Sequence, residues 1–203
     1  NTTPITITTL DGEKTYDGTP LTVSNYTYTQ NVLAEGDVLT VTLNGTQTAA
    51  GSSSNTIESY SVMRGNDDVT SFYTFSNPVL GTLTVNRRAV TLTSATESRM
   101  YNGSALTNNT VTVTGDGWAT NEGATYNVTG SQTNVGSSSN TFTYTLNNNT
   151  NADNYTINKT EGTLTVTAND STIVVTITEN SGEYTYDGTE KSVEGYKVTI
   201  EDT

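Results

Sequence analysis

The side chains best placed to do chemistry belong to a short motif that occurs three times in the chain. Tyr16-Asp17-Gly18 recurs as Tyr101-Asn102-Gly103 and as Tyr186-Asp187-Gly188, with 85 residues between successive tyrosines. A carboxylate could act as a general base or bind calcium, but the amide of Asn102 carries no charge and accepts no proton. Asp-Gly and Asn-Gly share a preference for turns in which φ is positive. We therefore predict a turn at each site, with a catalytic or calcium-binding role as the alternative.

The aromatic residues are the next candidates, because a ring can stack on a sugar or pack in a core. We expect Tyr16, Tyr101 and Tyr186 to pack at the edge of a core and to hydrogen-bond through the hydroxyl, with sugar stacking as the alternative. Trp118 lies in a Gly-Asp-Gly-Trp loop and is the candidate for direct ligand contact. Its counterpart 85 residues earlier is Leu33, and an aliphatic residue at the same place favours packing.

Acidic residues cluster in four places: Glu35-Gly36-Asp37, Asp67-Asp68, Asp116 and Asp153. Calcium needs six to eight converging oxygens, and none of these clusters has the spacing of an EF-hand. We predict no metal and no cofactor, with calcium between domains as the alternative. The clusters are interpreted as solvated turn charges. An alignment of the two loops pairs Glu122 with Glu35.

The composition excludes several classes of function. The chain of 203 residues has 21 acidic and 8 basic side chains, a net charge of −13, no Cys and no His. Thiol nucleophiles, disulfides and the usual general base are therefore absent, and we predict that the protein is not an enzyme. The negative charge opposes binding to nucleic acid or anionic lipid. No apolar run approaches the roughly 20 residues of a membrane span, so we expect no membrane insertion in this segment. The chain begins with Asn1 and is interpreted as a piece of a longer protein.

An internal repeat organises the chain. Three kinds of segment return in the same order: the alternating openings 5–8, 90–93 and 175–178, the Gly-Ser loops 51–56 and 136–141, and the closing Gly-Thr-Leu-Thr-Val runs 81–85 and 162–166. The second repeat is four residues shorter after its Gly-Ser loop. We predict domains at 1–86 and 87–168, followed by the truncated start of a third repeat at 169–203.

The apolar residues alternate with Thr at a period of two, which predicts strands that bury one face. No segment has the helical spacing of apolar residues, so we predict no substantial helix. Six or seven short strands in each repeat favour an all-β fold of tandem immunoglobulin-like β-sandwich repeats. The short joints between repeats favour an end-to-end arrangement. A β-grasp-like repeat is the alternative, and it requires a helix.

These segments together resemble the MBG/YDG-type tandem repeats of bacterial extracellular surface proteins. The resemblance rests on Tyr16 to Thr22, the Gly-Ser loop and the closing run, and it covers both full repeats and the opening of the third. The second repeat departs from the pattern of the first at Asn102, which replaces Asp17, and at Arg99, which replaces Lys14. The resemblance implies a secreted cell-surface module that spaces an adhesin or stalk, and it brings no catalytic residues.

The partners that this resemblance implies are the neighbouring repeats of the same chain. The alternative function is an adhesin repeat that recognises a host glycan or protein through its surface loops.

Overall fold

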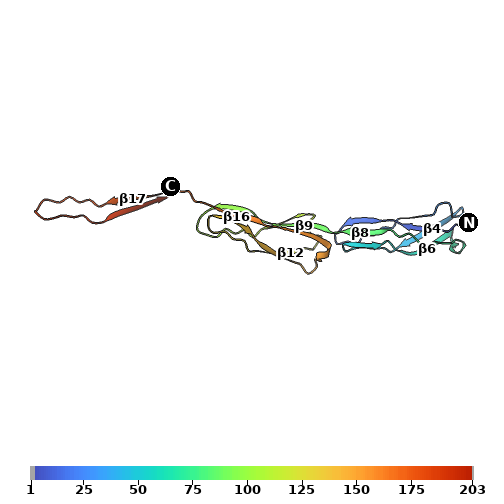
Figure 1. The fold of residues 1–203 in the computed structure, drawn as a ribbon. Coiled ribbons are helices and arrows are strands. Elements are labelled where there is room, and N and C mark those ends of the chain that lie inside the picture. The colour runs from blue at the N-terminus through green and yellow to red at the C-terminus, as the bar shows by residue number, and fades with distance from the viewer. Residues whose placement is uncertain (1–2, 203) are drawn as a thin grey trace.

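The computed structural model describes residues 3–202 as an elongated chain of β-strands in three successive groups (Figure 1). Repeat 1 (residues 3–86) and repeat 2 (residues 87–168) follow one another along the long axis, and the hairpin of repeat 3 (residues 169–202) extends beyond them. The predicted all-β, sandwich-type fold class is confirmed. Helical structure in the described residues is limited to two 3-10 turns of three residues each, so the helix of a β-grasp fold is missing. No helix in this part of the chain is long and apolar enough to cross a membrane.

The elements of repeat 1 are β1 (Ile7–Thr9), β2 (Gly12–Thr15), β3 (Tyr26–Tyr28), β4 (Asp37–Leu43), β5 (Gly51–Ser54), β6 (Ile57–Arg64), β7 (Asp67–Asp68), η1 (Thr70–Phe72) and β8 (Thr82–Asn86). Those of repeat 2 are β9 (Arg88–Ser94), β10 (Glu97–Met100), β11 (Val111–Gly115), β12 (Ala124–Val128), β13 (Gly136–Asn140), β14 (Phe142–Leu146), η2 (Ala152–Asn154), β15 (Tyr155–Thr160) and β16 (Gly162–Thr167). Repeat 3 contributes β17 (Ile173–Glu179) and β18 (Tyr196–Asp202).

Each complete repeat has more strands than the six or seven predicted, because long extended segments change sheet part-way. β1 pairs with β3, whereas β2, only two residues further on, pairs in parallel with β8. In the same way β5 pairs with β8, while β6 pairs with β4. Each change of sheet divides one sequence pattern into two strands. A repeat therefore has a leading half built on β1, β3, β4 and β6, and a trailing half built on β2, β8 and β5.

A buried asparagine holds these changes of sheet together. The Nδ2 of Asn55 donates to the carbonyl oxygens of Leu10 and Val23 at 3.1 and 3.0 Å, and the main-chain carbonyl of Asn55 accepts the Thr9 hydroxyl at 2.8 Å. Asn140 makes the equivalent bonds to Ala95, Asn108 and Ser94 in repeat 2. A side chain built on Gly45 would come within 2.5 Å of Asn55 Oδ1, so glycine is required there. Since buried carbonyls need donors, the asparagine fixes where the chain leaves one sheet for the other.

Three hydrophobic cores lie along residues 3–202. The first fills the leading half of repeat 1, around Ile5, Leu39 and Val62. The second joins Tyr16 and Val85 of repeat 1 to a group in repeat 2 made of Val90, Leu92, Ala119, Phe142 and Tyr155. The third is a small cluster in the trailing half of repeat 2, made of Leu106, Leu164 and Val166. The second core therefore crosses the boundary between the repeats.

The two repeats differ along the strand that precedes the closing run. β15 pairs in parallel with β9 along its whole length, from Tyr155 opposite Arg88 to Thr160 opposite Thr93. Its counterpart in repeat 1 forms two isolated bridges, between Ile5 and Phe75 and between Thr8 and Val79. The segment in repeat 1 has one more residue between its two bridges than β15 has between the equivalent pairs. Pro78 lies in this stretch and has no N–H to donate. The extra residue and the proline interrupt the strand in repeat 1.

Candidate functional site: the joint between repeats

The joint begins with a turn at each copy of the predicted motif. Gly18, Gly103 and Gly188 have φ of +84°, +80° and +79°. The Asp17 Oδ1 accepts the N–H of Thr19 at 2.8 Å, and Asn102 Oδ1 accepts the N–H of Ser104 at 3.1 Å. The Asp187 Oδ1 accepts the N–H of Thr189 at 3.0 Å. Each turn is therefore closed by a hydrogen bond to the side-chain Oδ1, an oxygen that both a carboxylate and an amide possess.

The first and third turns also hold a lysine. The Lys14 ammonium lies 2.7 Å from Asp17, and the Lys191 ammonium lies 2.6 Å from Asp187. Each lysine, together with the threonine that closes the turn, holds the pKa of its aspartate below the usual range. The two aspartates are exposed and the two lysines partly so, and ion pairs at such solvated positions add little to stability. The turns serve mainly to present the tyrosine that precedes each aspartate.

Tyr16 inserts its ring into the leading end of repeat 2. The ring is 6% exposed and packs edge-on against the ring of Tyr155 at 5.6 Å. Its hydroxyl donates to Glu122 Oε1 at 2.5 Å, and the hydroxyl of Tyr155 donates to Glu122 Oε2 at 2.8 Å. The N–H of Ala119 donates to the Tyr155 oxygen at 3.1 Å. One carboxylate therefore binds a phenol from each of two repeats.

This arrangement keeps both phenols protonated. Burial raises the pKa of Tyr155 to about 12, and the hydrogen bond and negative charge of Glu122 act in the same direction. Burial and then Glu122 raise the pKa of Tyr16 as well. A phenolate beside Glu122 would place two negative charges together in a poorly solvated site. The cluster of Tyr16, Glu122 and Tyr155, named the joint cluster below, therefore requires neutral tyrosines.

Backbone contacts around the joint cluster hold the repeats from several sides. A single residue, Arg87, separates β8 from β9, and its Nε donates to the carbonyl of Asp153 at 3.0 Å. Arg88 donates to the carbonyls of Gly117 and Asp116, and to that of Tyr16 at 3.3 Å. On another side, the N–H of Ala50 in repeat 1 donates to Asn154 Oδ1 in η2 at 2.9 Å. The bonds from Arg88 to Tyr16 and from Ala50 to Asn154 cross the boundary, and they lie on different sides of the joint, so they resist both bending and rotation.

Trp118 belongs to the same end of repeat 2 and is half-buried. Its indole N–H donates to the Tyr126 hydroxyl at 3.1 Å, and its ring packs edge-on against Tyr155 at 5.0 Å. The structure therefore places Trp118 against the second core, as its alignment with Leu33 favours, and not as an open platform for a sugar.

The counterpart of Glu122 in repeat 1 is Asp37, so the pairing with Glu35 was wrong. The N–H of Ala34 donates to Tyr73 Oη at 2.9 Å, and Tyr73 Oη donates to Asp37 Oδ2 at 2.5 Å, which reproduces the contacts of Ala119, Tyr155 and Glu122. The interpretation of Asp37 as a solvated charge is also wrong, because it is buried and paired with Arg64 at 2.6 Å. Arg64 and then Tyr73 lower the pKa of Asp37. In repeat 1 the carboxylate of Asp37 therefore binds Arg64, whereas in repeat 2 the equivalent carboxylate of Glu122 binds Tyr16.

The three motif tyrosines differ in burial because different structures lie beyond them. Tyr16 packs against a complete repeat and is 6% exposed, whereas Tyr101, which is followed only by the hairpin of repeat 3, is 40% exposed. Tyr186 lies in the loop between β17 and β18 and is 92% exposed. The expectation that each tyrosine packs at a core edge therefore holds for Tyr16, and Tyr186 contradicts it. The ring is buried only where a complete leading half lies beyond it.

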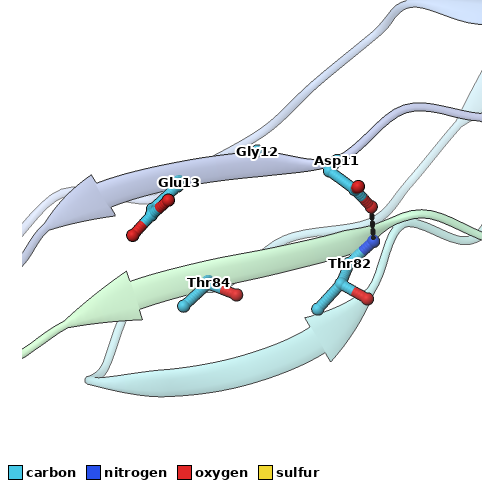
Figure 2. A pocket seen from close by; sticks show the side chains of 5 residues that line it. All are labelled: Asp11, Gly12, Glu13, Thr82 and Thr84. Atoms are coloured by element: carbon cyan, nitrogen blue, oxygen red, sulfur yellow. Dashed lines mark hydrogen bonds between the residues drawn. The ribbon is translucent and has the colours of Figure 1, made fainter.

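A shallow acidic hollow of about 370 Å³ lies on the trailing half of repeat 1 (Figure 2). Asp11 and Glu13 face Thr82 and Thr84 across it, and Asp11 accepts the N–H of Thr82 at 2.6 Å. In repeat 2 the hydroxyl of Thr96 takes over that bond. Because a neutral hydroxyl serves as well, the Asp11 carboxylate has a structural role. Across residues 3–202 no three Asp, Glu, His or Cys side chains converge as metal ligands would.

A second hollow, of about 220 Å³, lies in repeat 1 and is less polar. It lies beside the interrupted strand, between Ile57 to Tyr60 and Phe75 to Pro78. The rings of Tyr60 and Phe75 are 4.4 Å apart, and Tyr60 is partly exposed. In repeat 2 the continuous β15 lies along β9, and Lys159 covers the ring of Phe142 at 4.7 Å.

Within the joint cluster, Tyr16 of repeat 1 donates to Glu122 of repeat 2, so the cluster holds the two repeats in place. Comparisons with protein-family models, with curated proteins and with solved structures give no match to this chain.

Proposed function

We propose that this chain is a non-catalytic spacer of a bacterial cell-surface stalk or adhesin, whose repeats project another region away from the envelope. The observation that carries the proposal is Tyr16, a residue of repeat 1 that is buried in the leading end of repeat 2 and bonded to Glu122. A spacer needs stiff joints, because a flexible chain shortens its mean span.

Three features support stiffness at the first joint. One residue links β8 to β9, the second core contains side chains of both repeats, and hydrogen bonds cross the boundary from Ala50 to Asn154 and from Arg88 to Tyr16. The partners in this function are the neighbouring repeats themselves. A net charge of −13 keeps such rods apart and soluble.

Small-angle scattering tests the proposal. A compact globule of 203 residues has a radius of gyration of about 17 Å, and we expect a clearly larger value with the profile of a rod. Tyr16→Ala should broaden the distribution of shapes, because it removes the ring that fixes the joint. Tyr101→Ala is the matched control, since the same motif there has no complete repeat to enter. A compact profile for the unmodified chain, or equal effects of both variants, would refute the spacer function.

A second candidate function is ligand binding at the hollow beside Tyr60 and Phe75. An exposed ring with the Glu58 carboxylate and the Ser59 hydroxyl beside it has the chemistry that binds a sugar ring. Saturation-transfer NMR against a glycan panel tests this function. Saturation transfer to a glycan that is lost in Tyr60→Ala would support ligand binding. The absence of transfer to every glycan would refute it.

A further inference from the structure

The hairpin of repeat 3 has the same register as the first hairpin of each complete repeat. Glu179 lies opposite Tyr196, as Ser94 lies opposite Val111 and as Thr9 lies opposite Tyr26. The bond that continues each hairpin is also present, because Asn180 N–H donates to Gly195 O as Ala95 N–H donates to Thr110 O. β17 is therefore the equivalent of β9, and β18 is the equivalent of β11.

In repeat 2 both edges and the inner face of β9 are covered. β11 pairs with one edge, β15 pairs in parallel with the other, and Val90 and Leu92 are fully buried. Repeat 1 uses the same edge of its first strand for its interrupted counterpart of β15. The covering segment is thus a constant part of the repeat.

In repeat 3 the corresponding surface is bare in the described residues. Val175 and Ile177 are 53% and 64% exposed, although their counterparts Val90 and Leu92 are fully buried. The exposed face continues onto β18 through Tyr196, Val198 and Ile200. An isolated two-stranded hairpin is marginally stable in water, and an apolar face beside an open edge favours the addition of strands.

We propose that the β17–β18 hairpin is a strand-accepting site for a polypeptide segment of the repeat's own type, with the chemistry of residues 119–167. The incoming counterpart of β15 pairs in parallel with the open edge of β17, and its counterpart of Ile157 lies opposite Val175, as Ile157 lies opposite Val90. The counterparts of β12 and β14 cover the apolar face. Main-chain bonds supply the attachment, and the alternating side chains supply the selectivity.

A second contact is expected at the other side of the hairpin. Residues 182–185 correspond to β10 and are not in a strand, whereas β10 itself pairs in parallel with β16. An incoming counterpart of β16 gives this segment its partner. The completed leading half also brings a carboxylate equivalent to Glu122 toward Tyr101. Only this last consequence rests on the proposed spacer function.

The test extends the full chain after Thr203 with a second copy of residues 119–167, which continues the 85-residue spacing. Amide hydrogen exchange then monitors β17. We expect its edge-facing amides to exchange at least about 100-fold more slowly than in the unextended chain, as in a folded repeat. The same extension carrying Ile157→Asp is the control for the incoming strand, and Val175→Asp is the control for the hairpin. Both should abolish the protection.

Two results would overturn the proposal. One is an extension that folds while the β17 amides keep their original exchange rates. The other is equal protection in the Val175→Asp chain, which would mean that the apolar face is not the contact. The fluorescence and exposure of Tyr101 form a separate readout. If the β17 amides are protected while the fluorescence and exposure of Tyr101 stay the same, strand acceptance is retained. That result would refute the joint mechanism on which the spacer function depends.

Discussion

The trailing ends of repeats 1 and 2 carry the same motif and nearly the same strands, yet they differ in what they bury. Tyr16 is enclosed by Glu122, Tyr155 and the second core, while Tyr101 is 40% exposed and the cluster beside it holds only Leu106, Leu164 and Val166. The turn has the same geometry at both ends. The motif therefore holds a tyrosine at the trailing end of each repeat. That tyrosine stabilises the joint only where a complete repeat lies beyond it.

The largest difference between the two ends should come from removing the ring. Tyr16→Ala leaves a cavity in a shared core, and we expect it to destabilise repeats 1 and 2 by about 3 kcal/mol. Tyr101→Ala should cost under about 1 kcal/mol because Tyr101 is 40% exposed and belongs to no buried core cluster of the described residues. Chemical denaturation of both variants measures the difference. Equal losses would show that the joint does not couple the repeats.

Removing the shared carboxylate should have the next largest effect. Glu122→Ala leaves two buried hydroxyls without their acceptor, at a cost of about 1–3 kcal/mol. Combining it with Tyr16→Phe should give less than the sum of the two single effects, because both changes remove the same hydrogen bond. Strict additivity in this double-mutant cycle would contradict the contact between Tyr16 and Glu122.

Alkaline pH should weaken the joint of repeats 1 and 2 selectively. The pKa of Tyr155 is about 12 in the folded protein against about 10 when unfolded. Since the folded value is the higher one, the contribution is fully present below pH 10 and is lost as the pH rises toward 12. Unfolding measured between pH 8 and 12 tests this. Tyr155→Phe should flatten the profile, and an unchanged profile would count against the buried phenols.

A smaller effect is expected from exchanging the turn residues. Asp17→Asn keeps the oxygen that accepts the Thr19 N–H but gives up the ion pair with Lys14, so the loss should stay below about 1 kcal/mol. Asn102→Asp is the reciprocal change in the other turn. Thermal melts of both variants provide the measurement, and a loss of several kcal/mol from Asp17→Asn would assign the carboxylate a further role.

The smallest effect should be that of calcium. We expect melting temperatures in calcium and in chelator to agree within error, because the joint is held by side-chain and backbone hydrogen bonds. A ligand that binds only the native state raises the melting temperature. A clear increase in calcium would therefore place a metal site in the chain and revise the account of the joint.

Much of the fold could be predicted from the repeat, because equivalent positions share strand, register and turn, at 85 residues apart up to the Gly-Ser loop and at 81 in the closing run. The exchange of Asp17 for Asn102 was enough to predict the turns. The strand number was underestimated, because residues 12–15 contain no apolar residue and give no strand signal, although they pair with β8. Asn55 and Asn140 close the repeated Gly-Ser loops, and that recurrence was the available signal for a buried role.

The joint cluster was beyond the reach of sequence patterns. Tyr16 and Glu122 are 106 residues apart and belong to different repeats, so comparing one repeat with the next cannot reveal their contact. The alignment that paired Glu122 with Glu35 was wrong, and it also hid the structural equivalence of Glu122 and Asp37. In addition, Arg64 replaces the incoming tyrosine in repeat 1, so the same acid has a different partner in each repeat.

The parallel pairing of β2 with β8, and of β10 with β16, determines how a pull on the chain ends would be borne. Force enters a repeat through its first strands and leaves through its last, and these strands run in the same direction. Tension therefore slides one along the other and loads their hydrogen bonds together rather than one at a time. We expect each complete repeat to yield at high force in single-molecule stretching, and the open hairpin of repeat 3 to yield first, because its antiparallel strands separate pair by pair.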